Sequence, residues 1–448
     1  MVLIACCCLA DLYQYTCMLR DDEARALSHR GRLPIMIRFT PWMNWLHSWS
    51  GLLFGWLLFA VFLTGTLTVF DTEITAWMQP ELHEITSDMR QDDDGAAYWP
   101  AQLMSPLVRE GRDVSIDESL LFIKLQEKRT FSGQAIDPIT GRVVIFRDTQ
   151  GGDFFYHFHY GLLSGWPGAW LVGIAATVML ITLATGVCGL RWAFKDVVKV
   201  RIRPYPRAWV DVHNVTGLTV IPFHLMIVVT GLAMFWSVYM PVDIPLLRES
   251  EGIVPSLSIL HFAQFGGSPI RWLYFIMGSA ATVMIATGLI LWTVKRQASL
   301  TSRTGYRIVE VLNVATVAGL LMAVAAFFWA NRLLPLALPD RSHWEIRCFF
   351  IVWGLCLFHS LLRGGSIRAW RDQLYGSACL LGFLPLLNGL TTNSHLMMTV
   401  PTAQWAIAGI DLTGLTIGTL LGLAARRVGG RILRHHEEEH DSILKKCP

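Results

Sequence analysis

The 448-residue sequence has little charge: Asp, Glu, Lys and Arg together make up 16% of it, against about 25% in soluble globular proteins. Apolar residues make up 53%. This balance excludes a disordered chain and a nucleic-acid-binding protein, and it indicates a membrane protein. The formal net charge of +3 is small, so the positions of the charges are more informative than their sum.

Several common motifs are absent as well. The nine cysteines contain no C-x-x-C pair, so no disulfide framework is expected. No Walker, Rossmann or H-E-x-x-H pattern occurs, which leaves nucleotide binding and zinc proteolysis without support. The N-terminus lacks the basic region and the apolar core of a signal peptide. We therefore expect residues 1–35 to be a peripheral extension before the first membrane span.

Long apolar segments are abundant, and eight of them have about the length or more that a helix needs to cross a bilayer, which is about 20 residues. They are residues 46–70, 168–192, 210–236, 270–294, 306–330, 344–363, 373–391 and 404–425. Clusters of Lys and Arg precede the first span and follow the second, fourth, sixth and eighth. Because basic loops stay in the cytoplasm, we expect both termini to be cytoplasmic.

One long segment between spans, residues 71–160, is then extracytoplasmic. Its stretch from Asp71 to Asp153 holds 16 acidic and 8 basic residues. Ser115 and Glu118 form a capping-box pattern that predicts a helix over 115–127. Residues 134–146 predict a β-hairpin, because two β-branched runs flank a turn at Asp137–Gly141. We therefore expect a small α+β domain inserted after the first span.

Repeated patterns relate the first two spans to the third and fourth. His47 and His213 each begin an H-x3-G-L pattern, and a Thr-Gly pair follows 17 residues after each of them. His159 and His261 each begin H-[YF]-x4-G-x-P-x2-W, and a Thr-Gly pair follows 26 residues later. The four pairs are Thr64-Gly65, Thr230-Gly231, Thr185-Gly186 and Thr287-Gly288. These registers predict a duplicated helical hairpin, and we expect the Thr-Gly pairs to help the helices pack.

The duplication places the histidines. Two related hairpins imply a pseudo-two-fold axis along the membrane normal, so His47 should face His213 at the cytoplasmic end and His159 should face His261 at the opposite end. Two neutral imidazoles that face each other across a bundle suit bis-axial ligation of a haem iron. Histidines at helix ends are often only solvated interfacial side chains, and that alternative stays open for all four.

A fifth histidine breaks the repeat. His224 lies 11 residues after His213, which puts both on one helix face about 16 Å apart. Its counterpart in the first copy is Leu58. We expect His224 to hold or tune a group between the two haems. It could ligate haem iron deeper in the bilayer or pair with His159 or His261, and an interfacial, solvated side chain is the alternative.

These motifs together resemble one family. The residues concerned are Leu46-His47, Gly51-Leu52, Leu63-Thr64-Gly65, Asp137-Pro138, Thr140-Gly141, Phe158-His159-Tyr160, Asp211-Val212-His213-Asn214, Leu218, Pro222-Phe223-His224, Thr230-Gly231-Leu232, Leu260-His261-Phe262 and Gly266-Gly267. Over residues 36–296 the chain resembles the PepSY-associated transmembrane family of bacterial inner-membrane proteins. The resemblance implies a PepSY fold in the periplasm and, as in ferric-siderophore reductases, b-type haems in the helical core.

The sequence thus predicts an all-α polytopic membrane protein with an inserted α+β PepSY-like domain. Its expected parts are the extension 1–35, the first span 36–70, the periplasmic domain 71–160, a haem-binding core 161–296, four further spans 297–425 and a charged cytoplasmic tail 426–448. We expect two haems b and reduction of a periplasmic ferric chelate such as a ferric siderophore. The electron donor is left open. A non-enzymatic protein that binds a periplasmic partner and a permease are the alternatives.

Overall fold

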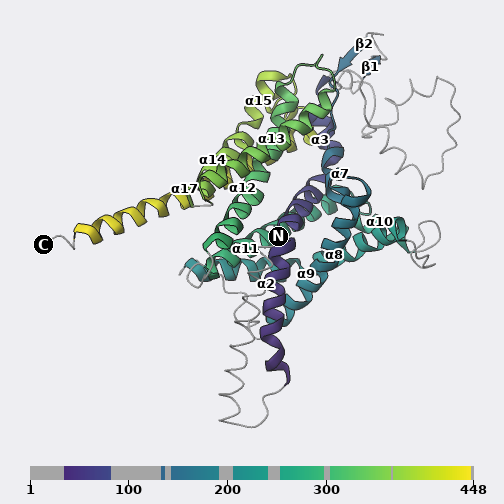
Figure 1. Cartoon of the computed structure of the whole chain (residues 1–448). Coiled ribbons are helices and arrows are strands. Elements are labelled where there is room, and N and C mark those ends of the chain that lie inside the picture. The colour runs from purple at the N-terminus through teal and green to yellow at the C-terminus, as the bar shows by residue number, and fades with distance from the viewer. Residues whose placement is uncertain are drawn as a thin grey trace, which may run out of the picture. The chain divides into compact units, whose positions relative to one another are not determined.

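The computed structural model describes residues 35–81, 133–136, 143–190, 205–240, 253–296, 303–364 and 367–444, and these are almost entirely helical (Figure 1). The long helices are α2 (Ile35–Thr68), α8 (Trp166–Leu190), α9 (Tyr205–Tyr239), α11 (Gly267–Arg296), α12 (Arg303–Leu333), α13 (Arg341–Leu362), α14 (Ile367–Gly382) and α17 (Trp405–Leu444). Shorter ones are α3 (Asp71–Met78), α7 (Asp153–Gly161), α10 (Val254–His261), α15 (Leu384–Thr391) and α16 (Leu396–Thr399).

Eight segments of the described chain are long and apolar enough to cross a membrane. They are Pro41–Thr68, Trp166–Gly189, Arg207–Tyr239, Gly267–Arg296, Thr304–Leu333, Arg341–Leu362, Ile367–Thr391 and Trp405–Gly429. Each contains or overlaps one predicted span, so the prediction of a multi-pass membrane protein is confirmed. The seventh span is interrupted, since α14 ends at Gly382 and α15 begins at Leu384, just before Pro385.

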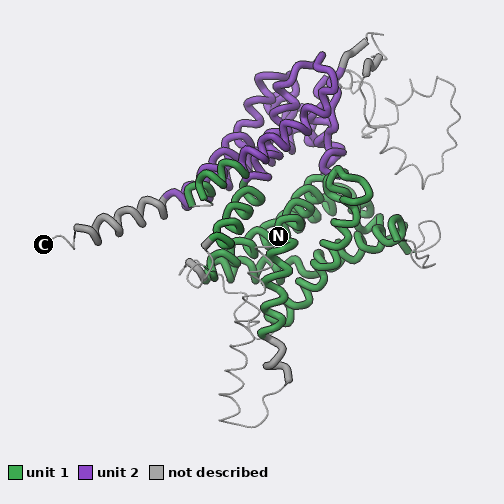
Figure 2. Tube along the Cα trace, in the orientation of Figure 1, with its two compact units in different colours: residues 1–69, 157–318, 357–370 green, residues 70–156, 319–356, 371–448 purple. Residues whose placement is uncertain are grey.

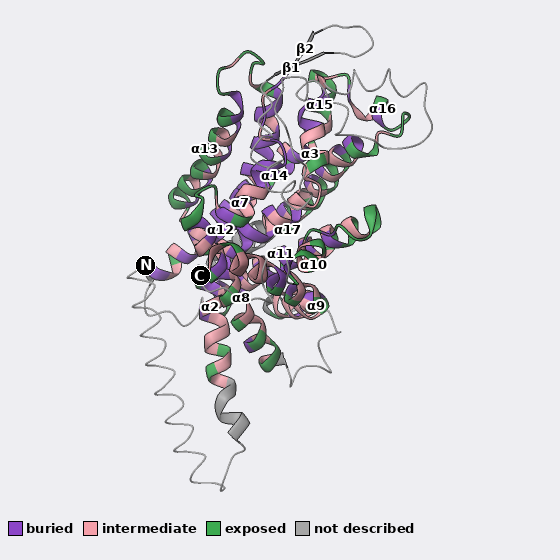
Figure 3. Ribbon diagram, turned by 90° about the vertical axis from the view of Figure 1, so that its right-hand side faces the viewer, coloured by how far each residue is buried: buried purple, intermediate pink, exposed green. Residues whose placement is uncertain are grey.

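The exposed surface of the helices supports a lipid environment. On α13 the exposed side chains are large and apolar, including Phe350, Ile351, Leu355 and Phe358, and Figure 3 shows this helix with a broad exposed face. Exposure of such a surface to water would cost free energy, whereas contact of apolar side chains with lipid hydrocarbon is favourable.

The described residues fall into two compact units, which Figure 2 distinguishes by colour. The first unit takes its residues from 1–69, 157–318 and 357–370, and the second from 70–156, 319–356 and 371–448.

In the first unit α2, α8, α9 and α11 form a bundle. Helix α2 packs against α8 and α11, and α9 packs against the same two helices. An exchange of α2 with α9 and of α8 with α11 leaves this set of contacts unchanged, as a two-fold relation between the hairpins requires. The packing of the four helices is therefore the arrangement that the predicted duplication requires.

The second unit holds an aromatic core to which the start of α7 contributes. Phe154 stacks on Phe327 of α12, with ring centroids 4.6 Å apart, and lies edge-on to Phe349 of α13 at 4.9 Å. From α3, Trp77 lies edge-on to Phe328 at 5.5 Å. Residues on both sides of the inserted segment are thus buried with the later spans.

A buried polar network in the second unit accompanies this core. Arg341 and Glu345, one turn apart on α13, form a fully buried ion pair at 2.5 Å. Asn331 donates Nδ2–H to Glu345 Oε1 at 2.8 Å, and Thr149, which follows the second strand, donates its hydroxyl to Glu345 Oε2 at 2.6 Å. Buried charges of this kind are stable only when paired and hydrogen-bonded.

A second part of the network surrounds α3. The guanidinium of Arg332 lies 3.7 Å from the ring centre of Trp77, and it donates to Asn388 Oδ1 at 3.0 Å. Trp77 Nε1 donates to Asp411 of α17 at 2.9 Å. Through these bonds the spans without a recognisable motif hold the segment on which the insertion begins.

The inserted segment matches its prediction only in part. Strands β1 (Gly133–Ile136) and β2 (Val143–Phe146) pair antiparallel, with Ala135 opposite Val144, so the hairpin is confirmed. The predicted helix 115–127 lies outside the described residues. Apolar residues near both ends of the segment, Ile74, Trp77, Phe154 and Phe155, are buried in the second unit, and the limits 71–160 stay a prediction.

Candidate functional site

The first unit brings four of the predicted histidines together in two pairs. The ring centroids of His47 on α2 and His213 on α9 lie 6.2 Å apart, with an interplanar angle of 69°. Those of His159 at the end of α7 and His261 at the end of α10 lie 6.3 Å apart, at 40°. Both pairings are the ones that the repeat predicts, and the structure confirms that the two rings of each pair lie close together.

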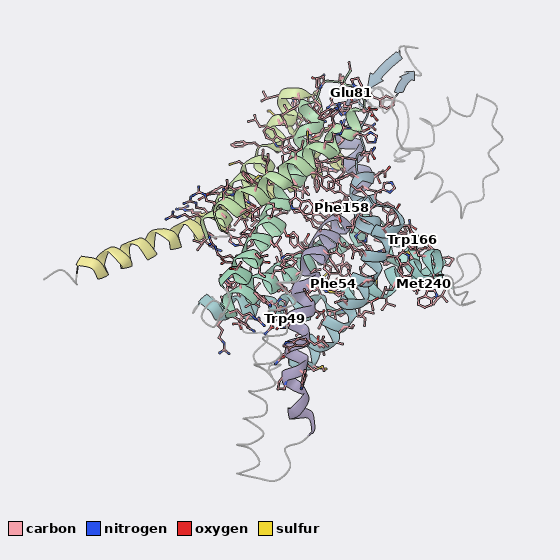
Figure 4. All side chains as sticks on the ribbon, viewed as in Figure 1. Trp49, Phe54, Glu81, Phe158, Trp166 and Met240 are labelled. Carbon is pink, nitrogen blue, oxygen red and sulfur yellow. The ribbon has the colours of Figure 1, made fainter. Side chains whose placement is uncertain are left out.

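The two pairs lie at opposite ends of the bundle. Trp49, two residues from His47, and Phe158, next to His159, mark these ends in Figure 4. His47 and Gly65, which lies against His159, are 18 residues apart on α2, or about 27 Å along a helix axis. We name the His47/His213 pair the basic-end site and the His159/His261 pair the insert-end site.

Each of the four rings is held through Nδ1 by the partner helix of its own hairpin. His47 Nδ1 lies 2.9 Å from the carbonyl of Thr182, and His213 Nδ1 lies 3.0 Å from that of Met284. His159 Nδ1 lies 2.8 Å from the carbonyl of Val61. A carbonyl can only accept, so Nδ1 carries the hydrogen in these three rings.

His261 is held in the same manner. Its Nδ1 lies 2.8 Å from the hydroxyl oxygen of Thr230. A hydrogen on Nδ1 leaves the lone pair on Nε2, the nitrogen that such histidines offer to a metal. The same arrangement at all four rings is therefore the one that leaves Nε2 able to accept a metal.

The environment of the insert-end site favours the neutral form. Burial lowers the pKa of His159 from its ordinary value. Burial also lowers the pKa of His261, to about 3, and the nearby His159 adds to this shift. Both imidazoles are uncharged at neutral pH, which is the state that can bind iron.

The separations of the rings fit one iron atom between each pair. An imidazole nitrogen binds a metal at about 2.0 Å, and the ring centre lies about 1.1 Å behind that nitrogen. Two imidazoles that held one iron between them would therefore have centres about 6.2 Å apart, and the observed values are 6.2 and 6.3 Å. Two histidines would suffice to hold a haem. No described group of three or more His, Cys, Asp and Glu side chains is arranged for a bare metal ion.

His224 is placed differently. It is fully buried on α9, its Nδ1 lies 3.0 Å from the carbonyl of Val220, and its Nε2 has no hydrogen-bond partner among the residues that the structure describes. Its ring lies 5.2 Å from that of Phe62. The four paired histidines, by contrast, are partly exposed. The structure therefore does not bring His224 together with another histidine in the described chain, and leaves it between the two sites.

One residue near the insert-end site has no counterpart in the sequence patterns. Tyr274 on α11 donates its hydroxyl to the carbonyl of Leu260 at 2.6 Å, directly before His261. Its ring packs edge-on against Phe223 at 5.3 Å. Because Tyr274 lies outside the histidine motif, the sequence patterns did not indicate its hydrogen bond to Leu260.

Comparison with known proteins agrees with the motifs. The model of the PepSY-associated TM region family matches residues 44–256 and 249–295. An uncharacterized protein of Pseudomonas aeruginosa, PA4219, is 29% identical over 170 residues, which cover 36% of this chain and 40% of that protein. The chain thus matches about two fifths of the length of this relative. No solved structure matches the chain significantly. Because the family model covers more than half of the sequence and contains all five histidines, this chain belongs to the family of membrane proteins with a PepSY-associated transmembrane region.

Proposed function

We propose that this protein is a haem-containing oxidoreductase of the bacterial inner membrane that reduces a periplasmic ferric chelate, such as a ferric siderophore. The observation that carries the proposal is the pair of His–His separations, 6.2 and 6.3 Å, with Nδ1 bound to the backbone or a threonine hydroxyl in every ring. Four independent imidazoles prepared alike are not expected of solvated helix-end histidines.

Each residue has a defined task in this proposal. His47 and His213 hold one haem b, and His159 and His261 hold the other. Bound haem supplies reversible one-electron transfer. The carbonyls of Thr182, Val61 and Met284 keep the tautomers of His47, His159 and His213 fixed. At the ferric chelate one electron converts Fe(III) to Fe(II), which weakens its hold on hard oxygen ligands.

Topology gives the direction of transfer. We place the Lys- and Arg-rich loops and both termini in the cytoplasm because basic loops are retained there. The basic-end site then takes electrons from a cytoplasmic or membrane donor, and the insert-end site faces the periplasm. The inserted segment, for which we propose a PepSY-like fold, lies on the side where the chelate arrives.

His224 has a separate role. It lies 11 residues after His213 and seven before Gly231 on α9, or about 16 and 10 Å along the helix. Its buried, unpartnered Nε2 places a polar atom in the interval between the two haems. We propose that it tunes their potentials rather than holding a third group.

The test is an absorption spectrum of the purified protein before and after dithionite. The proposal predicts a Soret band, a sharp reduced α-band and two haems per chain, with reoxidation by a ferric siderophore. Protein without haem would overturn the proposal and favour a non-enzymatic membrane protein or a permease. If the protein binds haem but no ferric chelate reoxidises it, the proposed haem sites remain valid and the proposed substrate is wrong.

A further inference from the structure

We propose that each Thr-Gly pair is a seat that fixes the position and the tautomer of one haem-ligating histidine, so that Gly65, Gly186, Gly231 and Gly288 are positioning residues. This inference rests on the proposed haem sites. It gives the four pairs a task more specific than helix packing.

The first observation is the space that the glycines leave. A Cβ added to Gly65 would lie 2.5 Å from His159 Nδ1. A Cβ on Gly186 would lie 3.0 Å from His47 Cε1, and one on Gly288 would lie 3.0 Å from His213 Cε1. On Gly231 it would lie 3.2 Å from His261 Cε1. In every pair, the atoms nearest to the missing side chain belong to a histidine ring, and to a different ring each time.

The second observation is the hydrogen-bond partner beneath each ring. In three cases the histidine Nδ1 bonds the carbonyl of the residue three positions before the Thr of the pair, which is Val61, Thr182 or Met284. In the fourth case His261 Nδ1 bonds the hydroxyl of Thr230, the Thr of its pair. One offset repeated on three helices indicates a common structural unit.

The threonine hydroxyl completes the unit. Thr64 Oγ1 lies 3.1 Å from the Val61 carbonyl, and Thr185 Oγ1 lies 3.0 Å from the Thr182 carbonyl. Thr287 Oγ1 lies 2.8 Å from the Met284 carbonyl. Thr230 Oγ1 lies 3.1 Å from the Ile227 carbonyl and also 2.8 Å from His261 Nδ1. Thr64, Thr185 and Thr230 also donate to the carbonyls of Ala60, Ile181 and Met226, at 2.8, 2.8 and 2.7 Å. In every pair the hydroxyl thus lies within hydrogen-bond reach of the carbonyl three residues before it.

The histidine and its seat lie on different helices of one hairpin. His47 of α2 uses the pair on α8, and His159, before α8, uses the pair on α2. The second copy repeats this exchange with α9 and α11. A seat that holds Nδ1–H leaves Nε2 for iron, and loss of such outer hydrogen bonds typically costs about 10–100-fold in metal affinity.

The distances predict a graded effect. In Gly65→Ala the ring of His159 must move by about 1 Å to restore a van der Waals contact of about 3.5 Å. The other three glycines require a few tenths of an ångström. Gly65→Ala should therefore impair the insert-end haem most, and Gly231→Ala least.

The experiment compares Gly65→Ala with two glycine controls. A Cβ on Gly278 would lie 2.5 Å from Thr66 Oγ1, an equally tight contact between helices without a histidine, and one on Gly354 would meet nothing within 4 Å. We expect Gly65→Ala to lower the haem content from two to about one per chain, through about 10–100-fold weaker affinity. The haem that remains should keep its spectrum and midpoint potential.

Equal haem loss in Gly278→Ala would show that tight helix packing explains the effect, and would overturn the seat. Full haem content with unchanged potentials in Gly65→Ala would also overturn it, while the haem sites stand. Thr64→Val should shift the potential of the insert-end haem, and Thr64→Ser should restore it. If the parent protein binds no haem, the proposed function fails. The seat is then judged by the ¹⁵N shifts of His159, which should report hydrogen on Nδ1 in the parent and its loss in Gly65→Ala.

Discussion

The buried ion pair of the second unit offers a quantitative test of what holds the later spans together. Glu345→Gln removes the negative charge but keeps the shape of the side chain. The amide oxygen can still accept from Asn331, and the amide nitrogen can donate to the Thr149 hydroxyl oxygen. Arg341 then keeps its positive charge in a fully buried position. Its remaining partners include the backbone carbonyl of Asp148 at 2.9 Å.

The expected cost follows from this burial. Removal of one partner of a buried pair destabilises a protein by about 3–5 kcal/mol, since the other charge is left uncompensated. Arg341→Met should cost a similar amount. The double variant Arg341→Met/Glu345→Gln removes both charges and should cost about 1–3 kcal/mol, mostly for lost hydrogen bonds. The double variant is therefore expected to be more stable than either single variant.

Thermal unfolding in detergent, followed by tryptophan fluorescence, measures these differences. For a unit of this size about 1 kcal/mol corresponds to roughly 2–4 °C, so Glu345→Gln should lower Tm by about 6–20 °C. The control is Asp372→Asn in the pair Arg371–Asp372, which has a 2.8 Å contact but side chains 35% and 23% exposed. That control should cost at most about 1 kcal/mol.

Two results would refute the argument. If the costs of the two single variants simply add in the double variant, the charges do not stabilise each other. If Glu345→Gln changes Tm no more than Asp372→Asn does, the pair is not buried in the membrane-embedded protein.

Further predictions concern the two haem sites and the topology. His47→Ala and His213→Ala should each remove the same low-spin haem, since one iron needs both rings, and redox titration identifies which haem is lost; loss of different haems would exclude the pairing. His159→Ala or His261→Ala should slow reoxidation of the dithionite-reduced protein by a ferric siderophore in stopped-flow measurements, with the spectrum of the basic-end haem retained; unchanged haem content and rate would identify both as interfacial side chains. A reporter fused after Trp99 should be active only in the periplasm, because the basic loops lie on the opposite side, and cytoplasmic activity would reverse the proposed orientation.

Composition and periodicity alone determined the membrane class and the eight spans. An apolar run of about 20 residues has no stable place in water, so local sequence decides where the spans are. The repeat also determined which histidines meet. A duplicated hairpin can bury its apolar faces against its own copy, and equivalent residues then approach across the axis.

Only the tertiary structure decided what the Thr-Gly pairs do. In the sequence, His47, Thr64 and Gly65 belong to one span. The 17-residue separation of His47 from Thr64 reflects only the length of that span. In the folded bundle His47 lies against Gly186, and Gly65 lies against His159. The partners sit on different helices, so no local spacing could reveal the contact.

The polar network of the second unit was equally hidden. Thr149 and Glu345 are 196 residues apart and Trp77 and Asp411 are 334 apart, and no motif marks any of them. Charged and polar residues in a span indicate that partners must exist, because lone buried charges are too costly. Which partners meet depends on how the helices pack, and packing is decided by the whole set of long-range contacts rather than by any one segment.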